Sequence, residues 1–413
     1  MTPIIPLVNT KPTKLALLFS SSLLALSMTG CGGGSDGNGG NTPPVSTASF
    51  SETATWQVTN LAPEAVTCYD FDIKAESSCA EDKWDIKFDN QARSVKLWSN
   101  SGDSGAGLGG VFGLIDWSDL SRYSNATQDP DTKRDITMHY NEDRSGGIFD
   151  AQPWFEYNLK GNHQLYPNNR VYLVTTDNSS AMTDSSVQQP IYAMQITNYY
   201  NYNDTGAFGG HPTLRWIDTA LPNKVQTKTI DASNNDNWVY FDLATGKSSS
   251  DKNSSWQIGF KRNDVILNGG DSGSGKTGGY LAATPAGYYD AQGKPITSQF
   301  TSDGSAATLA DLTNTAVYDK PLSARSWVID SKGSDLNPAY TGSFPNLDFG
   351  WYTYNGMTHQ LNTKPVDSAQ GALIRSAEGN SYARVRLDKI NYPDSSATTA
   401  TSWEFKIDIQ PAP

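Results

Sequence analysis

Alternation of apolar and polar residues is the dominant pattern along this chain. In SWEFKIDIQ, residues 402–410, apolar side chains occupy every second position: Trp403, Phe405, Ile407 and Ile409. Because successive side chains of a strand point to opposite faces of a sheet, this period predicts a half-buried β-strand. The 36 glycines and 21 prolines favour frequent turns. Segments of helical composition, such as DGSAATLADL at 303–312, are short. We therefore predict an all-β protein with antiparallel sheets.

One pattern of strands and turns occurs twice. The first copy reads YDFDIKAESSCAEDKWDIKF at 69–88, and the second reads VYFDLATGKSSSDKNSSWQIGF at 239–260. Each continues into a glycine loop, then a Trp-x-x-Tyr segment (WFEYN from 154, WYTYN from 351), and then a Tyr-Ala strand from 191 or 381. The repeat predicts two related antiparallel β domains at 51–232 and 233–413. Each has about 180 residues, enough to bury its own core.

The glycine loop of the second copy, GGDSGSGKTGG at 269–279, contains two motifs that suggest chemistry. Its G-x-x-x-x-G-K-T spacing is that of a phosphate-binding P-loop, and its G-D-S-G is that of trypsin-like serine proteases. A P-loop needs a helix after the lysine, but Gly278, Gly279 and Pro285 disfavour one. The first copy, SGDSGAGLGG from 101, has no lysine, and no histidine lies in the sequence setting of that protease family. We predict a backbone loop with glycines at positive φ and no enzymatic activity.

The carboxylates of Asp116 and Asp119 could suggest glycoside hydrolysis. Two exposed acidic side chains in a loop are the simpler interpretation of this pair.

The amino-terminal segment has the pattern of a lipoprotein signal. Lys11 and Lys14 precede an apolar stretch that ends before Cys31, which predicts a signal peptide at 1–30 and lipidation of Cys31. The alternative is an ordinary cleaved signal with an incidental cysteine. Residues 31–50 are rich in Gly, Ser and Pro and predict a flexible tether. Gly32 after the cysteine favours the outer membrane, and the sequence does not choose between its periplasmic and its exterior face. Several acyl chains on Cys31 would anchor the protein stably.

Net charge restricts the possible partners, and the cysteine content suggests a disulfide. The formal net charge is −12 and becomes −14 without the two signal-peptide lysines, so nucleic acid is not expected as a partner. In an oxidising compartment, Cys68 and Cys79 most simply form a disulfide. A metal site is the alternative, but no histidine neighbours either cysteine.

The order of motifs in the second copy, YFDL, SSWQIGF, LNGGDSGSGKTGG, WYTYN and SYARVRL, resembles the HmuY domain of outer-membrane lipoproteins that bind haem. The first copy is similar but more divergent. The resemblance implies a mostly β fold in which projecting hairpins hold haem through two axial histidines. It also implies a haemophore that takes haem from a host carrier protein and passes it to an outer-membrane receptor. Because the domain occurs twice here, each copy could bind a haem, both could share one, or neither could bind.

The four histidines are candidates for the haem iron ligands, since neutral imidazole is available near pH 7. His163 in GNHQL and His359 in MTHQL occupy matching places after the two Trp-x-x-Tyr segments. His139 and His211 lie in MHYNEDRSGG and GGHPTLRW. No motif locates the family's pair of axial histidines, so Tyr or Met ligands, or no iron coordination, stay open.

Several aromatic residues are candidates for the walls of a porphyrin pocket: Trp154, Tyr157, Trp351 and Tyr354, and also Tyr199 and Tyr200. The simpler interpretation is that strand aromatics of this kind pack a β core. Lys276, which differs between the two glycine loops, is a candidate partner for a haem propionate.

These observations predict a lipid-anchored protein that captures haem or another porphyrin and transfers it without catalysis. The alternative, from another class, is a structural or adhesive lipoprotein whose duplicated domain binds a protein or a glycan.

Overall fold

The computed structural model describes residues 49–80, 83–91, 94–179, 190–203, 206–318, 326–337 and 340–413. The predicted signal peptide at 1–30, Cys31 and the tether as far as residue 48 lie outside the described residues. Antiparallel strands predominate, and every α-helix has four residues, so the predicted all-β class is confirmed. In this part of the chain no helix is long and apolar enough to cross a membrane.

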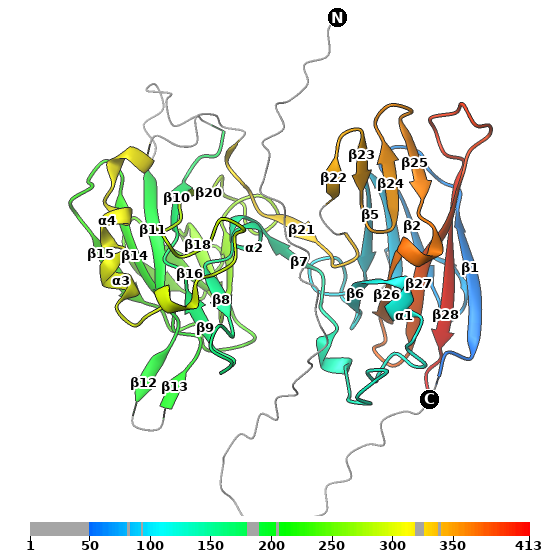
Figure 1. The fold of residues 1–413 in the computed structure, drawn as a ribbon, viewed down its shortest axis with the longest axis horizontal. Coiled ribbons are helices and arrows are strands. Elements are labelled where there is room, and N and C mark those ends of the chain that lie inside the picture. The colour runs from blue at the N-terminus through cyan, green and yellow to red at the C-terminus, as the bar shows by residue number, and fades with distance from the viewer. Residues whose placement is uncertain are drawn as a thin grey trace, which may run out of the picture. The chain divides into compact units, whose positions relative to one another are not determined.

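The chain forms two compact units, which we name by their place in the sequence. The central unit comprises Gly147–Asp330, and the terminal unit comprises the described residues up to Gly146 together with Ser331–Pro413. Figure 1 shows that strands dominate both units. Each unit is described separately below.

The terminal unit has a sandwich-like core. A five-stranded sheet in the order β1-β28-β27-β26-β6 and two four-stranded sheets, β3-β2-β4-β5 and β22-β23-β24-β25, contribute side chains to it. Its elements are β1 (Glu52–Val58), β2 (Ala65–Asp70), β3 (Ala75–Ser77), β4 (Ile86–Gln91), β5 (Ser94–Ser99), β6 (Gly110–Asp116), α1 (Trp117–Leu120), a 3-10 turn (Thr137–His139), β7 (Arg144–Gly146), β21 (Ser331–Gly333), β22 (Thr341–Ser343), β23 (Asn346–Asp348), β24 (Tyr352–Asn355), β25 (Gln360–Thr363), a 3-10 turn (Val366–Ser368), β26 (Gln370–Arg375), β27 (Tyr382–Asn391) and β28 (Ser402–Gln410).

The central unit repeats this plan with sheets β15-β14-β11-β10-β20 and β17-β16-β18-β19 and two hairpins, β8-β9 and β12-β13. Its elements are α2 (Ile148–Ala151), β8 (Phe155–Tyr157), β9 (Leu165–Pro167), β10 (Val171–Thr175), β11 (Ile191–Asn198), β12 (Asn201–Asn203), β13 (Gly206–Phe208), β14 (Thr213–Asp218), β15 (Gln226–Thr229), β16 (Val239–Asp242), β17 (Lys247–Ser249), β18 (Ile258–Lys261), β19 (Asp264–Leu267), β20 (Gly278–Ala283), 3-10 turns (Thr297–Gln299, Thr315–Val317), α3 (Gly304–Ala307) and α4 (Leu309–Leu312).

Several local predictions agree with these elements. The alternating segment at 402–410 forms β28, and its four apolar side chains are buried in the terminal core. The segment at 303–312 supplies the short helices α3 and α4. Cys68 and Cys79 form the predicted disulfide, with Cα atoms 5.3 Å apart.

The compact units do not coincide with the predicted domains at 51–232 and 233–413. Each unit combines the first half of one sequence copy with the second half of the other. In the terminal unit β6 of the first copy pairs with β26 of the second, and in the central unit β10 of the first copy pairs with β20 of the second. The predicted boundaries therefore mark sequence copies and not compact units. Because the copies are alike in pattern, a strand edge of one can pair with either copy, so sequence pattern alone does not choose between the two arrangements.

In each unit an arginine of the five-stranded sheet, buried in one unit and partly buried in the other, donates hydrogen bonds to an irregular segment that packs on the sheet. In the terminal unit Arg384 pairs with Asp408 and donates from Nη1 to carbonyl oxygens of the segment that contains α1. In the central unit Arg215 donates to the Gln195 side chain and to the Ser305 carbonyl oxygen, which lies in α3. These bonds satisfy backbone acceptors that the irregular segments would otherwise leave without partners.

The two glycine loops have the same structure in both units. In the terminal unit the carboxylate of Asp143 accepts a hydrogen bond from the Ser99 N–H (2.8 Å), and in the central unit Asp330 accepts one from the Leu267 N–H (2.8 Å). Asn100 Oδ1 accepts from the Gly107 N–H, as its counterpart Asn268 accepts from Gly275. The following residues, 278–283, form strand β20, so no helix leaves the loop. The interpretation as a backbone loop is thus confirmed.

Close backbone contact explains the first glycine of each G-D-S-G motif. Gly102 and Gly270 have φ of +48° and +60°. A Cβ atom there would lie 2.2 Å from the Asp143 carbonyl oxygen or 1.9 Å from the Asp330 carbonyl oxygen. Both the positive φ and the lack of space therefore require glycine.

The copies differ at a buried carboxylate that follows the Trp of each Trp-x-Ile-x-Phe strand. Asp85 is fully buried and accepts hydrogen bonds from the Phe71 N–H (2.9 Å) and the Ala377 N–H (2.8 Å). Its carboxylate lies within 4.8 Å of those of Asp70 and Asp72. Burial, with a smaller contribution from these two neighbours and against the two hydrogen bonds, raises the pKa of Asp85 to about 8.

In the second copy the equivalent residue is neutral. Gln257 accepts the corresponding hydrogen bond from the Leu243 N–H (2.7 Å). An uncharged acceptor therefore suffices for this turn, and the carboxyl group of Asp85 adds a dependence on pH.

Replacing Gly270 by alanine is expected to destabilise the protein by roughly 2–3 kcal/mol, because the new Cβ would meet backbone and the φ is unfavourable. Gly161→Ala is the matched control: Gly161 also has positive φ, but its Cβ would have nothing within 4 Å. Urea unfolding of both variants checks this. Equal losses of stability would mean that the contact with the Asp330 carbonyl oxygen costs nothing.

The second prediction concerns Asp85 and pH. Because its pKa is higher in the folded than in the unfolded chain, the stability that it contributes is complete below about pH 4 and is lost as the pH rises through about 8. Between pH 7 and pH 9 the unfolding free energy should fall by about 1.4 kcal/mol more in the wild type than in Asp85→Asn. Urea unfolding at the two pH values measures this, with the exposed Glu378→Gln as a control that keeps the wild-type decline. An equal decline in Asp85→Asn would contradict the assignment.

Candidate functional site

Two hairpins carry the histidines that the repeat singled out. His163 lies between β8 and β9 of the central unit, and His359 lies between β24 and β25 of the terminal unit. Both residues have φ of +56°, a left-handed conformation that is uncommon for a side chain with a Cβ. The side chain of Asn158 accepts a hydrogen bond from the His163 N–H, and that of Asn355 accepts from two amides of its own turn. The sequence thus builds the same strained tip twice.

In each tip a tyrosine contacts one ring nitrogen of the histidine. The Tyr157 hydroxyl lies 3.0 Å from Nδ1 of His163, and the Tyr354 hydroxyl lies 2.9 Å from Nδ1 of His359. Neither Nε2 has a hydrogen-bond partner among the described residues. In the tautomer in which Nδ1–H donates to the tyrosine oxygen, Nε2 keeps a free lone pair, which is the arrangement of a metal-binding histidine with a partner on its other nitrogen.

A second tyrosine anchors each hairpin. The sequence suggested Tyr200 as a pocket aromatic but did not indicate this role, and it did not single out Tyr392. The Tyr200 hydroxyl accepts a hydrogen bond from the Leu165 N–H (2.8 Å), and the Tyr392 hydroxyl accepts one from the Leu361 N–H (2.8 Å). Both tyrosines follow the Tyr-Ala strands, in ITNYY and in KINY. This shared Asn-Tyr ending was the signal that could have found them.

The other two histidines lie in different surroundings. The His211 ring is mostly buried, with Nε2 at 3.5 Å from Asp231 Oδ1 and Nδ1 at 3.3 Å from the Phe208 carbonyl oxygen. Both of its nitrogens are therefore occupied. His139 is exposed in the 3-10 turn of the terminal unit, and no side-chain partner is recorded for it within the described residues.

The candidate pocket aromatics separate into two groups. Trp154 and Trp351 are buried in the two cores, and their indole N–H groups donate to the carbonyl oxygens of Asn263 and Leu336. They therefore pack the cores, as the simpler interpretation of the sequence predicted, and offer no surface to a ligand. Tyr157, 57% exposed, and the half-buried Tyr354 remain as surface candidates at the tips.

Lys276 is exposed at the end of its glycine loop, and its backbone bridges to Asp177 and Gly269. No contact in the described ranges joins it to the His163 hairpin. A role for Lys276 at a propionate therefore stays a prediction.

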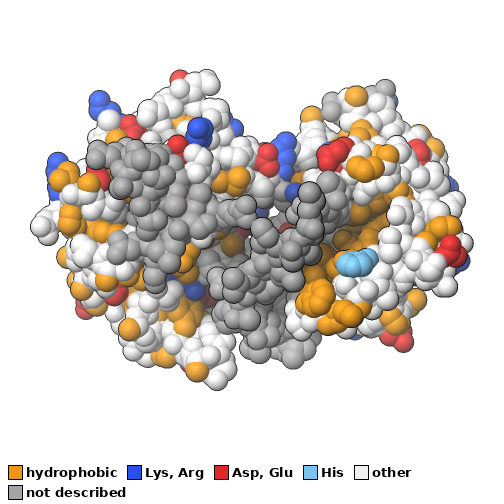
Figure 2. Space-filling view, turned by 90° about the horizontal axis from the view of Figure 1, so that it is seen from above, with side chains coloured by type: hydrophobic (Ala, Val, Ile, Leu, Met, Phe, Trp, Pro, Cys, Tyr) orange, Lys and Arg blue, Asp and Glu red, His pale blue; other side chains and the backbone are white. Residues whose placement is uncertain are grey.

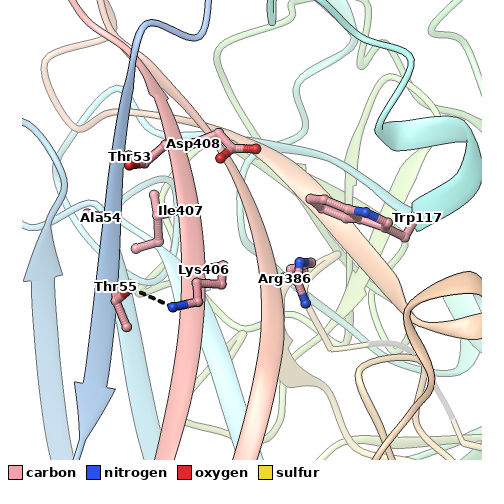
Figure 3. A pocket seen from close by; sticks show the side chains of 8 residues that line it. All are labelled: Thr53, Ala54, Thr55, Trp117, Arg386, Lys406, Ile407 and Asp408. Carbon is pink, nitrogen blue, oxygen red and sulfur yellow. Dashed lines mark hydrogen bonds between the residues drawn. The ribbon is translucent and has the colours of Figure 1, made fainter.

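One surface pocket, of about 340 Å³, lies in the terminal unit away from the candidate residues. Strands β1, β27 and β28 and the side chain of Trp117 line it, as Figure 3 shows. Its cations already have partners: Arg386 pairs with Asp388 (2.5 Å), and Lys406 pairs with Glu404 (3.2 Å) and donates to Thr55 (2.9 Å). This pocket therefore adds no group to the site.

The chain is thus an all-β protein with a Tyr–His hairpin tip in each unit. The model of the family described as HmuY protein matches residues 234–405, which confirms the resemblance for the second copy, including the His359 hairpin. The match does not extend to the first copy, whose relation to the family depends on the internal repeat. None of the curated proteins matches the chain.

Solved structures of three bacterial proteins overlap parts of the chain. They are an apo HmuY analog from Tannerella forsythia (15% identity, 45% of this chain and 95% of that one, TM-score 0.13), a protein of Bacteroides fragilis described as a lipoprotein (15%, 49% and 91%, 0.12), and a protein of Bacteroides vulgatus described as HmuY-like and haem-binding (16%, 48% and 91%, 0.12). The resemblance to the HmuY family rests on the match of the family model to residues 234–405 and not on these overlaps, whose TM-scores are low.

Removing the hydroxyl of Tyr354 should change the tautomer balance of His359 alone. In Tyr354→Phe the imidazole loses its Nδ1 partner, so its ¹⁵N chemical shifts should move toward those of a histidine without a partner. His163 in the same sample is the internal control, and Tyr157→Phe should give the reciprocal result. Unchanged shifts of His359 would show that the bond is not formed in solution.

Proposed function

We propose that this chain is a haem-binding lipoprotein that captures haem at its histidine-tipped hairpins and passes it on without catalysing a reaction. The observation that carries the proposal is the Tyr–His pair, which occurs with nearly the same geometry in both units and leaves each Nε2 available. Haem iron binds neutral imidazole through such a nitrogen. The HmuY match over 234–405 supports the same conclusion, since it includes one of the two hairpins.

The groups around the tips suit a porphyrin. A flat, apolar macrocycle needs hydrophobic contact with a few polar groups at its edge. Tyr157 is exposed beside His163, and Met357 is 72% exposed two residues before His359. The exposed ammonium group of Lys160, in the same turn as His163, could pair with a propionate.

Location and partners belong to the proposal as well. Lipidation at Cys31 would tether both units to the outer membrane through the segment at 31–50. Haem would come from a carrier protein of the host and would leave to an outer-membrane receptor. A chain with two histidine-tipped hairpins suits capture and transfer.

The test is a haemin titration of the purified chain from Gly32 onward. We expect new Soret and visible bands in the wild type and their loss in the double variant His163→Ala/His359→Ala, because iron ligation requires the two imidazoles. His139→Ala is the matched control, since it removes an exposed histidine outside the tips. Metal-free protoporphyrin IX should still bind the double variant through apolar contact.

No spectral change at micromolar haemin in the wild type would overturn the proposal. It would favour the adhesive alternative, in which the exposed hairpin side chains contact a protein or a glycan.

A further inference from the structure

Each unit contains a complete Tyr–His tip made from its own residues. Tyr157, His163 and the anchoring Tyr200 all belong to the central unit, and Tyr354, His359 and Tyr392 all belong to the terminal unit. Neither tip therefore needs a side chain from the other unit. This matters because the sequence copies themselves are divided between the units.

The exposed apolar side chains beside the two tips come from different elements. In the terminal unit the Phe344 ring, on the turn between β22 and β23, packs against Gly356 in the turn of the His359 hairpin: a Cβ on Gly356 would lie 2.2 Å from it. Phe344 is nevertheless 67% exposed, and Met357 is 72% exposed. Figure 2 shows a histidine beside a group of hydrophobic side chains on this unit.

In the central unit the corresponding surface belongs to the hairpin β12–β13, which projects from the unit in Figure 1. Tyr202 and Phe208 on this hairpin are 67% and 46% exposed. The Tyr202 ring lies 6.2 Å from that of Tyr200, whose hydroxyl binds the His163 hairpin. The terminal unit has no equivalent aromatic residues, since its connection at 392–401 reads YPDSSATTAT.

Charge also differs between the tips. The central turn, YNLKGNHQ at 157–164, contains Lys160, whereas the terminal turn, NGMTHQ at 355–360, contains no charged residue. Lys160 is exposed, and its ammonium group donates to the Phe300 carbonyl oxygen (3.2 Å) and lies 5.2 Å from the centre of the Tyr166 ring in β9. An anionic edge of a ligand would gain electrostatic attraction only at the central tip, and salt would screen this attraction.

We infer that each chain has two separate porphyrin sites, one at each unit, that share a histidine tip but differ in their apolar walls and in charge. The inference rests on the proposed haem binding and goes beyond it. The terminal site holds its ligand mainly by apolar contact with Phe344 and Met357. The central site uses Tyr202, Phe208 and the cation Lys160, so its affinity depends on ionic strength.

Stoichiometry tests the inference. Titration of the chain from Gly32 onward with haemin should give two equivalents, falling to one in His163→Ala and to one in His359→Ala. The equivalent left in His359→Ala, at the central site, should weaken as salt rises from 0.05 to 0.5 M, concentrations chosen to shorten the Debye length severalfold. The equivalent left in His163→Ala should change little.

Wall variants separate the two sites further. Phe344→Ala should lower haemin affinity by about tenfold at the terminal site only, because it removes one large apolar contact, and Tyr202→Ala should do so at the central site only. Val366→Ala, an exposed apolar residue outside the tips, is the control and should change neither.

The outcomes distinguish the inference from the proposed function. A single equivalent in the wild type would overturn the two-site inference while leaving haem binding intact. Equal salt dependence of the two remaining equivalents would overturn the assigned difference in charge. No haemin binding by any chain would instead overturn the proposed function.

Discussion

Strand pairing between the two sequence copies is the constraint on which the whole architecture depends. Each five-stranded sheet is completed by strands from both copies. In the terminal unit β1 and β6 of the first copy join β26, β27 and β28 of the second, and in the central unit β20 of the second copy joins β10, β11, β14 and β15 of the first. Backbone donors and acceptors at these edges need partners once they are buried. The central half of the chain therefore forms one compact unit, and the segments that precede and follow it in the sequence form the other.

The two units have the same local structure where backbone atoms are tightly packed. The two copies differ at positions where only side chains are in contact. The glycine loops keep the same glycine at positive φ, the same asparagine and the same buried aspartate, because a Cβ or a lost acceptor there would disturb backbone. Burial raises the pKa of both Asp143 and Asp330 to about 6. Position 85, in contrast, is an aspartate in one copy and its counterpart 257 is a glutamine, since either side chain can accept the backbone hydrogen bond.

The histidine tips combine both tendencies. The turn conformation, the Tyr–His bond and the tyrosine anchor occur in each unit, while the neighbouring apolar side chains come from β22–β23 in one and from β12–β13 in the other. A duplicated protein can in this way keep the geometry of one hairpin turn and vary its surroundings. Trp154 and Trp351, each directly before the first strand of its hairpin, are buried in both units, as the simpler interpretation of the sequence predicted.

The sequence by itself determined the local elements of this protein. Period-two alternation predicted the strands, self-comparison found the repeat and matched His163 with His359, and cysteine count predicted the disulfide. These features depend on neighbours along the chain. The tertiary structure alone decided which half-copies pair, and that Tyr200 and Tyr392 anchor the tips. Such contacts join residues far apart in sequence, and two similar copies offer equivalent partners, so local pattern cannot choose among them.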